Sequence, residues 1–297
     1  MKKISFLIGV LLSAQILFAQ SAKEILKQKT ERQLQNIVET SPFLTGIMAV
    51  DLITGDSFSI NQDLVFAQAS AIKIPILMEV YKQAHNKKFA LTDTRPLLAS
   101  NTVAGSGILN AMTDPVTLSI RNYSLLMIGL SDNSATNTLI DLVGMQNINN
   151  TMEALGFKNT RVQRKMIDQP ASLRNEENLS TPAEAVKIMK LLFEGKFINK
   201  STSDEILTTL QKNAVENSKI AKGIPPNVKI AFKPGGMGGV STEWALVYLA
   251  KRPYAVAIME NYKAGSSSQD FMAAISKTLY EYYSRMAKAT NYGVILD

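Results

Sequence analysis

The sequence predicts an α/β fold in which an all-helical lobe is inserted into a lobe built from both ends of the chain. Strand-like patterns occur near the N-terminus and again near the C-terminus, and mainly helical patterns fill the middle. Strands at both ends imply one sheet that draws on both termini. The expected α/β lobe covers about residues 21–65 and 215–297, and the helical lobe covers about 66–214.

The elements follow from hydrophobic periodicity. Helices are predicted where apolar residues recur near a period of 3.6, at residues 22–38, 67–84, 133–143, 182–192 and 269–286. Strands are predicted where short apolar runs flank turns, at residues 45–51, 57–60, 228–232, 243–250 and 254–259. Pro75 is compatible with helix 67–84 if it lies in the first turn. Residues 165–178 are polar and poorly periodic, and we expect a loop there.

The first twenty residues have the pattern of a secretory signal peptide. Lys2 and Lys3 precede an apolar run at residues 4–18, and a plausible cleavage zone follows at 18–20. The run of about fifteen apolar residues is short for a membrane span. We therefore expect a secreted, periplasmic protein with no stable membrane anchor, whose single hydrolase domain comprises residues 21–297.

The composition excludes several classes of site. The chain has no cysteine, which rules out disulfides, cysteine-ligated metals and cysteine nucleophiles. His85 is the one histidine and lies in a polar tail, which argues against a Ser-His-Asp triad and a histidine-based metal site. The formal net charge is +7, but no aromatic residues are interleaved with the lysines, so nucleic acid is a poor partner. We expect a monomer without cofactor or metal.

Three short strings carry the chemistry. Ser70-Ala-Ile-Lys73 lies at the start of the second helix, Ser131-Asp-Asn133 follows about sixty residues later, and a string beginning at Lys233 follows about a hundred residues after that. Each string alone is weak evidence. Their order and spacing together outline a serine nucleophile beside a lysine, a second serine for proton relay and a second lysine for an anionic substrate.

Ser70 and Lys73 are three residues apart on a predicted helix, so their side chains share a face. A lysine can take the serine proton only if it is neutral, and burial near a second cation such as Lys233 would lower its pKa. A helix start also directs main-chain N–H groups toward a forming oxyanion. The alternative is that Ser70 is an ordinary N-cap.

The other two strings offer groups that bind or protonate a substrate. The Ser131 hydroxyl can pass a proton to a leaving nitrogen, and the Asn133 amide can hold a substrate amide. Lys233 can attract a carboxylate, and Gly235 and Gly236 let a substrate backbone approach the strand edge. The alternatives are an N-cap cluster for the first string and a glycine-rich hairpin for the second.

With these strings in place, the chain resembles the penicillin-recognising serine hydrolases and, within them, the class A β-lactamases. The likeness runs from about residue 45 to the C-terminal helix and includes residues 105–109 and 127–137. It implies an antiparallel sheet flanked by helices, and a small-molecule β-lactam or peptidoglycan-like substrate. It also implies an acylated Ser70, proton transfer by Lys73 and Ser131, substrate binding by Asn133 and Lys233, and an oxyanion hole formed by the N–H groups of Ser70 and Gly236.

Two departures from this family concern substrate binding and deacylation. Pro234 stands where the family has threonine or serine, which removes a hydroxyl and a strand N–H. Met166 stands where the family has the glutamate that activates the deacylating water. Any substitute base must come from the nearby carboxylates, which are Asp168, Glu176 and Glu177, or from Lys73, and we take Asp168 as that base. Fast acylation and slow deacylation are therefore expected.

Three functions compete. The first is a class A-like β-lactamase, and the second is a D-alanyl-D-alanine peptidase or esterase on the same scaffold. The third is a non-hydrolysing penicillin-binding sensor domain that acylates and stalls. The complete set of nucleophile, lysines and relay serine favours an enzyme, whereas Met166 keeps the sensor open.

Overall fold

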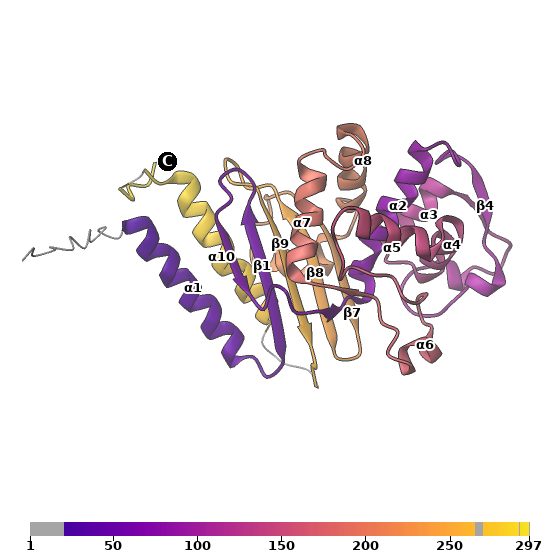
Figure 1. Cartoon of the computed structure of the whole chain (residues 1–297), viewed down its shortest axis with the longest axis horizontal. Coiled ribbons are helices and arrows are strands. Elements are labelled where there is room, and N and C mark those ends of the chain that lie inside the picture. The colour runs from indigo at the N-terminus through magenta and orange to yellow at the C-terminus, as the bar shows by residue number, and fades with distance from the viewer. Residues whose placement is uncertain (1–20, 265–269, 291, 297) are drawn as a thin grey trace, which may run out of the picture.

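The computed structural model describes residues 21–264, 270–290 and 292–296 (Figure 1). The expected signal peptide at 1–20 and Gln269, at the start of the last predicted helix, lie outside the described residues. Strands from both ends of the chain form one five-stranded antiparallel sheet with the order β2-β1-β9-β8-β7. The predicted sheet made from both termini is thus confirmed. Its strands are β1 (Leu44–Asp51), β2 (Ser57–Ile60), β7 (Ile230–Met237), β8 (Val240–Val247) and β9 (Tyr254–Asn261).

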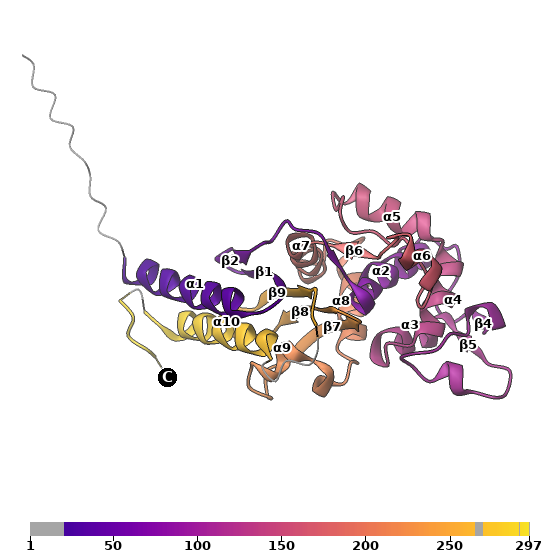
Figure 2. The same ribbon diagram turned by 90° about the horizontal axis from the view of Figure 1, so that it is seen from below.

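Helices cover both faces of this sheet. α1 (Ala22–Thr40) and α10 (Phe271–Lys288) lie side by side on one face, as both views show (Figures 1 and 2). α7 (Pro182–Phe193) packs on the other face against β1, β8 and β9. Beyond α7 lie the remaining long helices, which are α2 (Lys73–His85), α3 (Ile120–Gly129), α4 (Asn133–Val143), α5 (Met145–Ala154) and α8 (Lys200–Leu210).

The smaller elements connect these layers. Two short helices are present, α6 (Gln169–Leu173) and α9 (Lys219–Lys222). Two small antiparallel pairs join β3 (Phe66–Ala67) to β6 (Leu179–Ser180), and β4 (Thr94–Pro96) to β5 (Thr117–Ser119). Residues 165–178, predicted as a loop, therefore contain the α6 turn.

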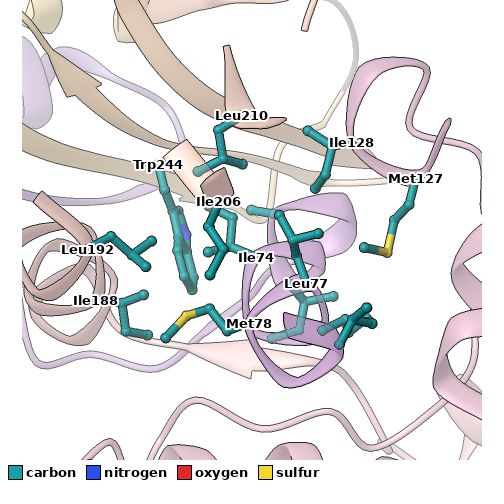
Figure 3. Packing of buried hydrophobic residues seen from close by; sticks show 14 of the residues in the cluster. Ile74, Leu77, Met78, Met127, Ile128, Ile188, Leu192, Ile206, Leu210 and Trp244 are labelled. Carbon is teal, nitrogen blue, oxygen red and sulfur yellow. The ribbon is translucent and has the colours of Figure 1, made fainter. Parts of the chain in front are cut away.

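Alternation along the strands divides the apolar core in two, because successive side chains point to opposite faces. Ile47, Val256 and Ile258 pack toward α1 and α10. Trp244 points to the opposite face of the sheet. There it belongs to a cluster with Ile74 of α2, Ile188 of α7 and Ile206 of α8 (Figure 3). Burying one large apolar side chain of this kind contributes roughly 1.5–3 kcal/mol. The helix that follows the predicted nucleophile is therefore firmly held against the sheet.

The prediction for residues 67–84 is wrong at its start. Ala69–Ile72 form a tight 3₁₀ turn, named η1, and the α-helix begins only at Lys73. Ala69 has φ 44°, which ends the preceding extended segment abruptly and excludes a continuous helix from residue 67. Pro75 lies in the first turn of α2, as expected.

The bounds of β7 and β8 also differ from the prediction, because both strands extend closer to the turn between them. The turn falls at Gly238-Gly239, where Gly239 has φ 74°, and not at the string that begins with Lys233. Gly235 and Gly236 are strand residues that pair with β8. The alternative of a glycine-rich hairpin therefore describes the second pair of glycines only.

Candidate active site

A buried glutamine fixes the turn that carries Ser70. The Gln68 side chain donates to Phe66 O (2.8 Å) and accepts from Trp244 Nε1 (2.9 Å). Its main-chain oxygen accepts from Thr242 Oγ1 at 2.8 Å. These bonds join η1 to β8, so the position of Ser70 is set by a strand that lies far away in sequence.

Lys73 points directly at Ser70. Its Nζ is fully buried and lies 3.0 Å from Ser70 Oγ, 3.1 Å from Ser131 Oγ, 2.8 Å from Ser131 O and 3.0 Å from Asn133 Oδ1. The last two oxygens can only accept, so a neutral amine would give them its two N–H groups and present its lone pair to a hydroxyl. Burial and then the charge of Lys233 hold the pKa of Lys73 well below its usual value. This geometry suits a lysine base.

The Ser131 turn is held by the acid that follows it. Asp132 is buried and accepts from Ala135 N (2.8 Å), from Ile108 N (2.7 Å) and from Leu109 N (2.9 Å). Ser131 itself has φ 54°, a conformation uncommon for serine, and in it both its carbonyl and its hydroxyl contact Lys73. The predicted N-cap reading is also true, because Asp132 caps α4.

Lys233 reaches the same hydroxyl from the sheet. Its fully buried Nζ lies 3.1 Å from Ser131 Oγ and 3.1 Å from Pro234 O. Burial lowers the pKa of Lys233 to about 7, and Glu243 acts in the opposite direction. Ser131 Oγ therefore bridges two lysines, a suitable position for a proton relay.

The free edge of β7 faces η1. Proline has no N–H, so Pro234 cannot exchange a pair of ladder bonds with Glu243, its partner on β8. The main-chain groups of Pro234, and of Gly236 two residues later, consequently point to the free edge, where an oxyanion donor is needed. A Cβ on Gly236 would meet only Val240 O, at 4.0 Å, whereas one on Gly235 would lie 2.5 Å from Gln68 O. Gly235 thus permits the close approach of η1 to β7.

Two cavities meet at Ser70. The first has a volume of about 670 Å³ and runs along β7 past Ser131 and Lys233. The second has a volume of about 290 Å³ and lies against the loop that contains Met166. The first wall also includes polar residues to which the sequence assigned no role, among them Ser106, Asn213, Lys219, Glu243 and Lys263. Ser106 lies in the segment 105–109 that resembles the family, whereas the other four belong to no recognisable string, and the fold brings them together.

The loop carboxylates lie outside the walls of both cavities. Asp168 caps α6 by accepting from Ala171 N at 3.1 Å, Glu176 pairs with Arg174 at 2.7 Å, and Glu177 pairs with Arg164 at 2.8 Å. The catalytic role of Asp168 stays a prediction. Met166, by contrast, is 7% exposed and lines the second cavity together with Ser70.

Within residues 21–264, 270–290 and 292–296, no three His, Asp or Glu side chains gather as metal ligands would. Across the same ranges, no helix is both long and apolar enough to cross a membrane.

Comparison with known proteins identifies the family of this chain. Residues 29–283 match the model of the beta-lactamase enzyme family. The imipenem-hydrolyzing β-lactamase of Enterobacter cloacae is 23% identical over 245 residues, which cover 78% of this chain and 82% of that protein.

Solved structures share the fold. A β-lactamase of Sphaerobacter thermophilus superposes with a TM-score of 0.79 at 27% identity, covering 86% of this chain and 97% of that one. A mutant of PBP-A, solved as an acyl-enzyme complex with penicillin G, superposes with a TM-score of 0.77 at 23% identity, covering 86% and 96%. The fold and the family together support a serine hydrolase that acts on β-lactams. The chain belongs to the beta-lactamase enzyme family, as a divergent class A member.

Proposed function

We propose that this protein is a secreted serine hydrolase that opens β-lactam rings through an acyl-enzyme on Ser70 and deacylates slowly. The observation that carries the proposal is the 3.0 Å contact between Ser70 Oγ and the buried Lys73 Nζ. The signal-peptide pattern at residues 1–20 supports secretion.

Acylation would use the whole constellation. Neutral Lys73 accepts the Ser70 proton while Ser70 Oγ attacks the lactam carbonyl, and the N–H groups of Ser70 and Gly236 receive the negative charge on oxygen. The C–N bond of the ring then breaks, and Ser131 gives its proton to the leaving nitrogen and regains one from Lys73. Lys233 attracts the substrate carboxylate.

The absence of a hydroxyl at Pro234 leaves the carboxylate fewer partners at the strand edge. Lys219 supplies a second cation in the same wall, and its Nζ lies 2.9 Å from Ser241 Oγ. We include Lys219 in the binding site for the substrate carboxylate.

Deacylation would be the slow step. A water that attacks the acyl carbonyl needs a base within hydrogen-bond reach, and a thioether is not one. No acidic side chain is among the residues that line the cavity shared by Ser70 and Met166. This feature also favours a second candidate function, a penicillin-binding sensor that acylates and does not turn over.

A penicillin pulse followed by mass spectrometry tests the proposal. The expected result is an adduct on Ser70 with the mass of the intact drug, which decays slowly. Ser70→Ala should lose the adduct. Ser106→Ala is the matched control, because Ser106 lines both cavities without contacting Lys73. An adduct of equal yield in Ser70→Ala would refute the assignment, and an adduct that never decays would favour the sensor.

A further inference from the structure

The two lysines of the site pose an electrostatic problem. Lys73 and Lys233 are both fully buried, and Ser131 Oγ lies 3.1 Å from each ammonium nitrogen. Burial opposes a positive charge on either group, and two like charges this close oppose each other further. The reaction nevertheless needs them in opposite states, with Lys73 neutral and Lys233 charged. Some feature of the protein must therefore favour the charged form of Lys233 over the charged form of Lys73.

Glu243 is a buried acid on the strand next to one of the two lysines. It is 1% exposed and lines the same cavity as Lys233. It lies opposite Pro234 in the β7–β8 register, so its side chain leaves the sheet on the face away from that of Lys233. Its carboxylate accepts from Lys219 N at 2.9 Å, from Ile220 N at 3.3 Å and from the Ser218 hydroxyl. All three donors are neutral, so they stabilise a negative charge without cancelling it.

We propose that Glu243 is the counter-ion of Lys233, a positioning residue that keeps the positive charge of the lysine pair on Lys233 and so leaves Lys73 free to act as the base. Its consequence for catalysis rests on the function proposed above. The two groups form no direct ion pair among those found in the described part of the chain. The attraction therefore acts at longer range, through an interior that screens charges weakly.

The charged groups around the pair support this assignment. Burial raises the pKa of Glu243 to about 7, and the hydrogen bonds from Ser218, Ile220 and Lys219, followed by the charge of Lys233, oppose that rise. On the other side, Asp132 favours the charged form of Lys73 but is outweighed by burial and by Lys233. Lys219, on α9, lies along the same cavity wall and would add to the repulsion felt by Lys233. Only Glu243 raises the pKa of Lys233 appreciably.

A purely structural role for Glu243 can be separated from this one. The same carboxylate joins the start of α9 to β8, so it holds the segment that carries Lys219. Glu243→Gln keeps an oxygen that accepts from both amides but removes the charge. A structural residue would tolerate this change, whereas a counter-ion would not.

The test follows the titration of Lys233 directly. NMR of the protein labelled at lysine Cε, with the Lys233 signal assigned from Lys233→Met, gives its midpoint in wild type and in Glu243→Gln. Loss of the carboxylate should move the midpoint to lower pH by about one unit. Glu184→Gln is the matched control, because Glu184 is also buried and accepts from a main-chain N–H, that of Asn159 at 3.0 Å, but lines neither cavity.

Acylation supplies the second measurement. Lys233 attracts carboxylates only while protonated, so the alkaline limb of the acylation profile should move to lower pH in Glu243→Gln. At a pH on that limb, the advantage of a penicillin over its methyl ester should fall about tenfold, because one pKa unit is a tenfold change in equilibrium. The ester lacks the carboxylate and reports any change that does not pass through Lys233.

The outcomes distinguish the two proposals. An unchanged Lys233 midpoint in folded Glu243→Gln overturns the counter-ion, even if penicillins acylate the protein. A shifted midpoint in a protein that penicillins do not acylate supports the counter-ion and refutes the function. If Glu243→Gln does not fold, the reciprocal measurement decides: Lys233→Met should raise the pKa of Glu243, read from its carboxyl carbon, and an unchanged value would overturn the proposal.

Discussion

Replacing Met166 by glutamate should convert slow deacylation into fast deacylation. The main chain of Met166 is fixed by Asn137, whose amide oxygen accepts from Met166 N at 2.8 Å and whose amide nitrogen donates to Met166 O at 3.3 Å. Both contacts reach main-chain atoms of Met166, so a change of its side chain leaves them in place. The side chain lines the cavity of about 290 Å³ that also contains Ser70.

The magnitude follows from these facts. Methionine and glutamate have side chains of similar length, so the new carboxylate would enter the cavity where the attacking water has to lie. A general base contributes typically about 10²–10⁴-fold, and we expect the lifetime of the acyl-enzyme to shorten by about 100-fold or more. Because Met166 is 7% exposed, the buried carboxylate should also lower the free energy of unfolding, by about 2 kcal/mol.

Stopped-flow hydrolysis of nitrocefin would measure both phases. In wild type we expect a burst followed by a slow steady rate, and in Met166→Glu the burst should merge into rapid linear turnover. Met166→Gln is the matched control, since it has the same length and polarity without a base. Equal acyl-enzyme lifetimes in the two variants, with acylation intact in both, would show that the position does not face the deacylating water.

Three further predictions concern the remaining site. Lys73→Arg should lose most acylation, because arginine cannot release its proton at workable pH; a near-normal adduct by mass spectrometry would place the base elsewhere. Gly235→Ala should lower the melting temperature and slow acylation strongly, since its Cβ would lie 2.5 Å from Gln68 O. Gly236→Ala should leave the melting temperature unchanged, because the space around its Cβ is open. Asp168→Asn should lengthen the acyl-enzyme lifetime without reducing the burst if Asp168 is the base; an unaltered lifetime would assign it to helix capping alone.

The part of the site that depends on side-chain identity could be predicted from the sequence. The three strings identify five site residues, and the structure brings all five together: Ser70, Lys73, Ser131, Asn133 and Lys233. The first two strings can be recognised because each joins two polar side chains over a few residues, and Lys233 can be recognised by its distance along the chain from them.

What depends on tertiary contact could not be predicted. The tight turn at Ser70 is fixed by bonds between Gln68 and residues of β8, and no local periodicity encodes them. The sequence places Glu243 at the start of a predicted strand and gives no sign of its burial. That burial depends on α9, whose first N–H groups bind the carboxylate. The predicted strand ends too early, at residue 232, because Pro234 and the two glycines of β7 suit a turn as well as a strand edge.

The bond between Gln68 and Trp244 spans 176 residues, and β9 pairs with β1. The nucleophile therefore cannot acquire its final geometry until nearly the whole polypeptide is available, because strands near the C-terminus orient it. Such distant pairing implies a high contact order and comparatively slow folding. A chain exported unfolded across a membrane would therefore be inactive during export. It could form an acyl-enzyme only after its C-terminal strands had crossed the membrane and folded.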